Sequence, residues 1–194
     1  MQHQHFGIII FSKYPIIKKR IISGYPNNYN STFQYADIVK GTDTFRVFNV
    51  HLQSLRLSRT NLNYINKPSI NGDEDLEKSK SLISKLKNGF IKRQLQADRI
   101  RSEMEKSPYP NIVCGDFNDV PNSYAYSAIG KGMKNAFVEK GSGMGRTFTG
   151  ISPTLRIDNI FVDKRFDVEQ FTRIKRNLSD HYPIIADVKK VNKE

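Results

Sequence analysis

The chain has 194 residues, enough for one domain with a hydrophobic core, and its 38% hydrophobic content with 12 Phe and 9 Tyr excludes a disordered protein. The 31 Lys and Arg residues against 19 Asp and Glu give a net charge of +12, which favours polyanionic partners such as nucleic acid or anionic lipid surfaces. A single cysteine, Cys114, excludes an internal disulfide and a thiolate metal cluster. The longest apolar stretch, residues 6–11, is too short to span a bilayer, and no pattern of a signal peptide or membrane anchor is visible.

The beginning of the chain reads as strands. Residues 7–11 form an apolar run that predicts a fully buried strand, which Pro15 stops because proline cannot donate to a strand ladder. Residues 32–39 and 44–52 are two further strand-like runs, and the glycine-containing loop at 40–43 between them predicts a hairpin.

The middle of the chain contains the main helix. Polar residues 61–75 predict a surface loop insertion, and apolar residues recur at helical spacing over 76–106, which predicts one long helix or a helix broken at Gly89. A buried strand is expected at 111–114, and the six glycines of residues 130–150 indicate a flexible loop.

The last part of the chain reads as strands again. Residues 156–162 form a strand with an acid near its start, and residues 166–176 lead to a loop that carries Ser-Asp-His at 179–181, before the apolar run at 184–186. Strands and one long helix interleave without strict alternation, so the predicted class is α+β or layered α/β, with a single domain over residues 1–194.

Polar residues that can do chemistry lie at or near the ends of these predicted strands. They are His51, Asp116, Asn118, Asp158, Asp180 and His181. A sheet brings residues that are distant in sequence to one rim, where His51 and Asn118 are candidate donors to a phosphate. For the Ser-Asp-His tripeptide alone, the simpler alternative is that Asp180 caps a turn and His181 covers it.

The other residues of this set suit phosphate ester hydrolysis, which needs a hard divalent ion, a group that activates water, and donors to the phosphate oxygens. Asp180 offers an oxygen ligand suited to Mg²⁺, and Asp116 is a base or a second ligand. His181 orients or deprotonates water or contacts the phosphate, while Asp158 holds its imidazole in the useful tautomer.

Five short motifs carry a resemblance to a known family. They are residues 12–16 (Ser-Lys-Tyr-Pro-Ile), 49–52 (Asn-Val-His-Leu), 115–118 (Gly-Asp-Phe-Asn), 156–161 (Arg-Ile-Asp-Asn-Ile-Phe) and 179–183 (Ser-Asp-His-Tyr-Pro). In this order the motifs resemble the endonuclease/exonuclease/phosphatase superfamily, whose members include deoxyribonuclease-I-like nucleases.

The resemblance implies a fold, a reaction and a set of site residues. The fold is a four-layered α/β/β/α sandwich with two mixed, mainly antiparallel sheets, and the reaction is Mg²⁺- or Mn²⁺-dependent cleavage of a phosphoester, whether in nucleic acid, a phospholipid headgroup or a small molecule. The implied catalytic residues are His51, Asp116, Asn118, Asp158 and His181, and the implied metal ligands are Asp180 and Asp116. Asp158 is the partner of His181, and whether Asp116 or His181 is the general base stays open.

One departure from the family pattern concerns the first residues. Family domains open with a strand that carries an asparagine and a later strand that carries a metal-binding glutamate, whereas the first acid here is Asp37, which we expect at the surface of a strand. The chain is therefore expected to correspond to the C-terminal two-thirds of such a domain. The alternative function is a catalytically silent, truncated module that binds phosphate or nucleic acid.

Overall fold

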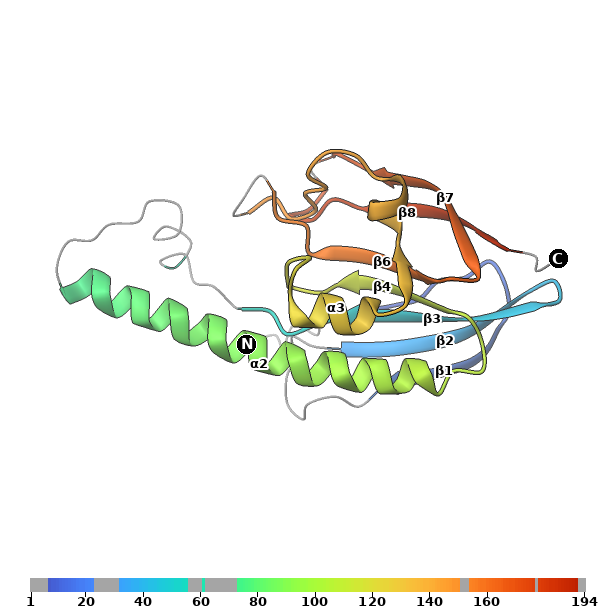
Figure 1. Ribbon diagram of the computed structural model, residues 1–194, viewed down its shortest axis with the longest axis horizontal. Helices are drawn as coiled ribbons and strands as arrows, with labels where there is room; N and C mark the ends of the chain where they lie inside the picture. The colour runs from blue at the N-terminus through green and yellow to red at the C-terminus, as the bar shows by residue number, and fades with distance from the viewer. Residues whose placement is uncertain are drawn as a thin grey trace, which may run out of the picture.

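A computed structural model describes residues 7–22, 32–55, 61, 73–150, 154–176 and 178–191 of the chain (Figure 1). The strands are β1 (Ile16–Ile22), β2 (Thr32–Lys40), β3 (Asp43–His51), β4 (Asn111–Asp116), β5 (Met133–Asn135), β6 (Asp158–Asp163), β7 (Phe166–Arg173) and β8 (Ile184–Lys190). The helices are α2 (Asp73–Glu105), α3 (Tyr124–Gly130) and α4 (Ala136–Lys140). Among these described residues, no helix is both long enough and apolar enough to span a bilayer.

The strands form two sheets. A six-stranded mixed sheet has the order β1-β2-β3-β4-β6-β5, in which β3 and β4 are parallel and the other neighbours are antiparallel. The chain returns from β3 to the parallel strand β4 through the long helix α2, as a parallel pair requires. The hairpin of β7 and β8 forms the second, two-stranded antiparallel sheet.

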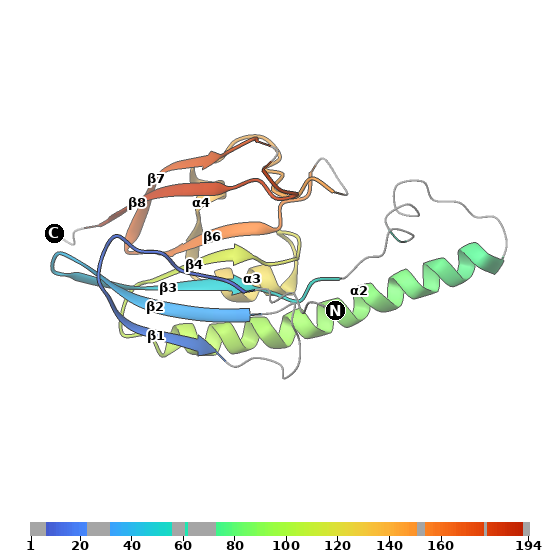
Figure 2. The same ribbon diagram turned by 180° about the vertical axis from the view of Figure 1, so that it is seen from behind.

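Two hydrophobic clusters hold these layers together. The first lies between α2, α3 and one face of the six-stranded sheet, and its largest buried members are Phe33, Phe48, Phe117, Ile100 and Ile129. The second lies between that sheet and the β7–β8 hairpin, with α4 at its border, and is built on Ala136, Val162, Phe166 and Val168. Figures 1 and 2 show the long helix α2 along the lower part of the large sheet and the β7–β8 hairpin above that sheet. The predicted α+β class, with helices outside two sheets, is confirmed.

The expected strand at residues 7–11 is wrong. This segment has no strand structure, and the side chains of Ile9 and Phe11 are 64% and 85% exposed. It crosses the sheet, where the side chain of Gln34 donates to the carbonyl of Ile8 and that of Asn49 to the carbonyl of Ile9 (Figure 2). The edge of β2 that does not face β3 is paired with β1, so residues 7–11 have no strand partner at that edge.

Two predicted loops contain regular structure. Residues 130–150 hold β5 and α4, because β5 pairs with β6 and the Asn135 side chain caps α4 by accepting from the backbone N–H groups of Phe137 and Val138. The predicted insertion at 61–75 ends earlier than expected, since α2 begins at Asp73, and its residues 62–72 lie outside the described part. Helix α2 is continuous through Gly89.

Asp37 is buried rather than exposed, so the sequence-based expectation for it is wrong. Its side chain is 1% exposed and lies opposite Arg46 across the β2–β3 ladder. Arg46 donates from Nε to Oδ1 at 2.6 Å and from Nη2 to Oδ2 at 2.9 Å, and its guanidinium lies 3.9 Å from the centre of the Tyr35 ring. This two-bond contact raises the pKa of Arg46. Such a fork-to-carboxylate pair satisfies both buried charges.

Removal of one partner from this pair is expected to destabilise the fold strongly. Arg46→Ala leaves the Asp37 carboxylate buried without its counter-ion, which should lower the free energy of unfolding by about 3–5 kcal/mol. The matched control is Arg165→Ala, which removes an arginine paired with Asp163 at the surface and should cost about 1 kcal/mol or less. Urea unfolding followed by circular dichroism measures both values, and equal costs would contradict the structural role of the buried pair.

Candidate functional site

Three neighbouring strands of the large sheet bring their polar ends into one row. His51 is the last residue of β3, Asp116 is the last of β4, and Asp158 is the first of β6. The ladder pairs His51 with Asp116 and Asp116 with Asp158. Because paired residues in neighbouring strands lie about 5 Å apart, the register alone places an imidazole beside two carboxylates.

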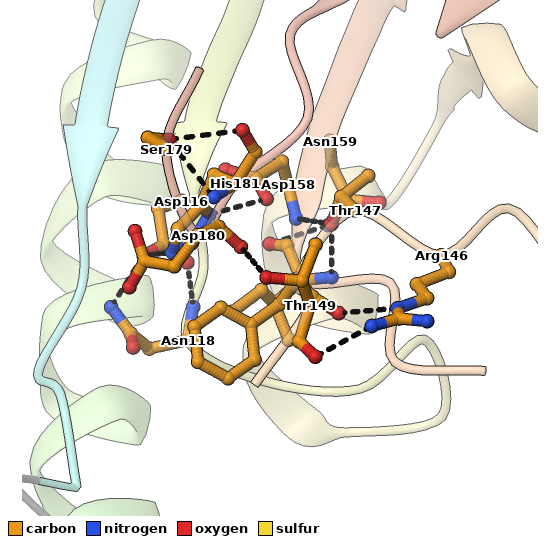
Figure 3. Close-up of polar contacts among 12 residues, drawn as sticks. Asp116, Asn118, Arg146, Thr147, Thr149, Asp158, Asn159, Ser179, Asp180 and His181 are labelled. Atoms are coloured by element: carbon orange, nitrogen blue, oxygen red, sulfur yellow. Dashed lines mark hydrogen bonds and ion pairs between the residues drawn. The ribbon is translucent and has the colours of Figure 1, made fainter. Parts of the chain in front are cut away.

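His181 joins this row from the loop that precedes β8 (Figure 3). Its Nδ1 lies 2.9 Å from Oδ2 of Asp158, and its Nε2 lies 4.0 Å from Oδ2 of Asp116. Nε2 of His51 approaches the same Asp116 oxygen at 3.7 Å. An ionised Asp158 can only accept a hydrogen bond, so Nδ1 of His181 carries the proton and the neutral ring presents a lone pair at Nε2.

A tight turn after β4 orients Asp116. The φ angle of Gly115 is 141°, and a Cβ on this residue would lie 1.9 Å from the carbonyl oxygen of Val50, so only glycine allows β4 to lie this close to β3. Asn118 has a left-handed φ of 49°, which asparagine tolerates better than most residues. Its backbone N–H donates to Oδ1 of Asp116 at 2.7 Å, and its Nδ2 donates to Oδ2 of Asp116 and to the carbonyl of Leu52, each at 3.0 Å.

The loop that carries Asp180 and His181 is held by residues that sequence analysis did not single out. Thr149 donates from its backbone N–H and its hydroxyl to the carbonyl of Asp180, at 2.8 and 3.0 Å. Phe148 forms a β-bridge with His181, and the centres of their rings are 5.0 Å apart. These contacts, together with the hydrogen bond to Asp158, restrict the orientation of the imidazole.

Thr147 connects this loop to strand β6. Its buried hydroxyl accepts hydrogen bonds from the backbone N–H groups of Ile157 and Asp158, at 3.0 and 3.1 Å, and its carbonyl accepts from the N–H of Tyr182 at 2.7 Å. One residue therefore positions both members of the Asp158–His181 pair. Sequence analysis missed Thr147 because the glycines of residues 130–150 indicate a flexible loop. The Thr-Phe-Thr sequence at 147–149 is nevertheless typical of a strand and was the available signal.

The surroundings of Asp116 and His181 raise the pKa of each group for a different reason. Burial, and to a smaller extent the nearby charge of Asp158, raise the pKa of Asp116 to about 6. The hydrogen bond to Asp158 is the main reason why the pKa of His181 is raised. Near neutral pH this arrangement keeps Asp116 mostly ionised and favours a protonated His181 more than an ordinary histidine.

Three of these side chains can hold a metal ion together. Ligand atoms of Asp116, Asp158 and His181 all lie within 4.8 Å of one another. Two adjacent carboxylates repel each other, as the raised pKa of Asp116 shows, and a divalent cation between them would remove that repulsion. Their oxygens suit Mg²⁺, and the added imidazole suits Mn²⁺ as well. The donor set therefore fits the expected cofactors.

Asp180, the other expected metal ligand, lies at the border of this group. Its side chain is exposed, and the described cluster of ligand atoms does not include it. Its charge still contributes to the raised pKa of His181, so its carboxylate acts on the site through space.

Neutralisation of Asp158 is expected to lower the pKa of His181. Asp158→Asn removes both the charge and the acceptor that favour the imidazolium, so the pKa of His181 should fall towards the ordinary value near 6.5. NMR titration of the imidazole in the presence of EDTA measures the change. Asp187→Asn, at an exposed position of β8, is the control and should leave the titration in place, whereas an equal shift in both variants would argue against the pair.

The chain is similar to known proteins in both sequence and fold. Residues 1–181 match the Endonuclease/Exonuclease/phosphatase family. A search of curated proteins finds no match to the chain.

Solved structures with a similar fold share little sequence with the chain. A functionally unknown conserved protein from Enterococcus faecalis has 18% identity and a TM-score of 0.64, over 92% of this chain and 68% of that one. An endonuclease/exonuclease/phosphatase from Bacteroides vulgatus has 20% identity and a TM-score of 0.62, over 92% and 67%. The mannosyl-6-phosphatase of Bacteroides thetaiotaomicron has 18% identity and a TM-score of 0.55, over 91% and 67%.

The chain thus spans about two-thirds of the length of these structures. The family match covers most of the residues, including all of the strand-end row and the His181 loop. On this basis, the chain belongs to the Endonuclease/Exonuclease/phosphatase family.

Proposed function

We propose that the chain hydrolyses phosphoester bonds with the aid of a divalent metal ion. The observation that carries this proposal is the convergence of two carboxylates and two imidazoles, from Asp116, Asp158, His51 and His181, at one edge of the sheet. When bound, Mg²⁺ or Mn²⁺ would neutralise phosphate charge and stabilise the leaving oxygen. Asp116 and Asp158 would hold the ion, with Asp180 able to add a further oxygen ligand beside them.

Asp116 and His181, which face each other, have different roles in this proposal: one accepts a proton and the other donates a hydrogen bond. Asp116, with a pKa of about 6, is ionised at neutral pH and still basic enough to accept a proton from water. His181, whose pKa is raised by Asp158, favours the charged form that stabilises negative charge on a phosphate oxygen. Asp116 is therefore the base in this proposal, and His181 is the donor that binds the reacting phosphate.

Two further side chains orient the substrate and the base. His51 faces Asp116 from the neighbouring strand and can donate to a non-bridging phosphate oxygen. Asn118 acts on Asp116 instead, because its N–H and its Nδ2 bond both carboxylate oxygens. Asn118 is thus a positioning residue, which holds the carboxylate in one orientation before substrate arrives.

The substrate class follows from charge more than from shape. A net charge of +12 raises the local concentration of anions, which favours negatively charged phosphoesters over neutral substrates. The similar mannosyl-6-phosphatase is a phosphatase by its name, and its fold supports phosphoester chemistry in general. A nucleic acid, a phospholipid headgroup and a small phosphoester all fit this class.

Hydrolysis assays test the proposal directly. Bis-p-nitrophenyl phosphate, p-nitrophenyl phosphate and plasmid DNA should be hydrolysed with Mg²⁺ or Mn²⁺ and not with EDTA. His181→Ala should lower kcat about 100-fold or more, since it removes the group that binds the reacting phosphate. Asp187→Asn is the matched control and should retain wild-type turnover. A folded protein that binds phosphoesters without any turnover would refute the hydrolase and favour the silent binding module.

The pH dependence of the reaction provides a separate test. Protonation of Asp116 removes the proposed base, so kcat/KM should fall tenfold per pH unit below about pH 6. The profile is measured at a metal concentration well below saturation, because bound metal would relieve the repulsion that raises the pKa of Asp116. It covers roughly two pH units on either side of the expected midpoint. A rate that stays constant down to the ordinary carboxylate pKa, about 4, would exclude Asp116 as the base.

A further inference from the structure

A groove lies beside the candidate site, between helix α2 and the segment that leaves β3. Its described lining comes from Gln53, Ser54 and Leu55 on one side and from Lys85, Asn88, Gly89 and Lys92 of α2 on the other. The helical residues follow the spacing i, i+3, i+4 and i+7, which places them on one face of the helix. The open space between these walls is about 260 Å³.

A glycine keeps this groove open. A Cβ at Gly89 would lie 2.5 Å from Cδ2 of Leu55 and 3.0 Å from Nη1 of Arg93, so any other residue would push the two walls apart or fill the space between them. The helix is uninterrupted at this position, so the glycine is not needed to end or bend it. Its role is the close approach of the β3 segment to α2.

The groove is cationic. Lys85 and Lys92 are half-buried along its helical wall, and its lining contains no acidic residue among the described ones. Lys85 donates to Oδ1 of Asn61 at 2.6 Å, which holds its stem against the helix while an ammonium retains two further donors. Half-buried ammonium groups interact more strongly with an anion than fully hydrated ones, because less water screens them.

Hydrogen bonds connect the chain segment that lines the groove to the candidate site. The N–H of Leu52 donates to the carbonyl of Asp116 at 2.9 Å, and its own carbonyl accepts from Asn118, so the backbone just before the groove is part of the site's hydrogen-bond network. Arg93, which is 1% exposed, then bonds the carbonyl of Gln53 at 3.0 Å and the carboxylate of Asp119 at 2.8 Å. Gln53 follows His51 by two residues, a separation of about 7 Å in extended chain.

We propose that this groove binds a second phosphate group of the substrate. The inference rests on the proposed function, and it narrows the substrate to molecules in which two phosphates are separated by a short spacer. The reacting phosphate lies at Asp116 and His181, and the second lies between the ammonium groups of Lys85 and Lys92. Single-stranded nucleic acid and small bisphosphates, such as sugar bisphosphates, both carry this chemistry.

The test compares substrates that carry one or two phosphates. The ratio of kcat/KM for a two-phosphate substrate to that for bis-p-nitrophenyl phosphate should fall about tenfold in Lys85→Gln/Lys92→Gln, because two charge-assisted contacts are lost. Lys80→Gln/Lys87→Gln removes the same charge from exposed positions of α2 and should leave the ratio unchanged. An unchanged ratio in the groove variant, or an equal fall in the control, would overturn the inference.

Two probes separate the possible sources of the second phosphate. A 5′-phosphorylated oligothymidylate and a sugar bisphosphate are compared in the same variants, and loss of preference for either one supports the groove while identifying the spacer it accepts. For the oligothymidylate, the slope of log affinity against log salt should also decrease by about 1–2 in the groove variant. If neither probe loses preference, the groove does not bind phosphate.

A binding measurement distinguishes failure of this inference from failure of the proposed function. Fluorescence anisotropy of the labelled oligothymidylate and calorimetry of the sugar bisphosphate are performed in EDTA, where no hydrolysis occurs. If the wild-type chain turns over nothing but binds a probe about tenfold more tightly than Lys85→Gln/Lys92→Gln, the groove is supported and the hydrolase is not. If hydrolysis occurs but both proteins bind equally, the hydrolase stands and the groove is refuted.

Discussion

The close parallel contact between β3 and β4 is the constraint on which the site depends. Val50 and Gly115 are paired in this ladder, and the carbonyl of Val50 occupies the space where a side chain of Gly115 would lie. One residue further along, the same register places His51 beside Asp116. A bulkier residue at position 115 would move β4 away from β3 and would separate the imidazole from the carboxylate, even if every side chain of the candidate site were present.

The sequence was most informative where a local pattern and a chemical role coincide. The hairpin of β2 and β3, the long helix α2 and the strand at β4 lie close to their expected positions, because alternation and helical spacing are properties of adjacent residues. The Gly-Asp-Phe-Asn turn was recognised from its sequence, and the structure explains three of its residues. Gly115 allows the close contact between strands, Asp116 supplies the carboxylate, and Asn118 adopts the left-handed conformation. The expected position of His51, Asp116 and Asp158 at strand ends agrees with the ladder, which pairs them in one row.

Other features depend on partners that a single sequence does not reveal. The apolar run at residues 7–11 has the composition of a strand, but β1 occupies the edge that it would need. Arg46 lies nine residues from Asp37 in sequence, and only the hairpin register brings the two side chains opposite each other. Thr147 likewise holds the site through hydrogen bonds from the backbone N–H groups of Ile157 and Asp158, ten and eleven residues later in the sequence. In each case the decisive contact is tertiary, so local propensity gives the wrong environment.

The division of the strands into two sheets means that the site is assembled from two structural units. His51, Asp116 and Asp158 lie on the six-stranded sheet, whereas His181 lies three residues before β8 of the hairpin. Among the described strands, β7 and β8 form a sheet of their own. The hairpin is attached to the larger sheet by side-chain packing, by loop hydrogen bonds and by two ion pairs, Lys134 with Asp167 and Lys190 with Asp43. Sub-global opening of the hairpin would therefore withdraw His181 while the rest of the row stays folded, so the lifetime of the complete site is set by the weaker unit rather than by the stability of the whole protein.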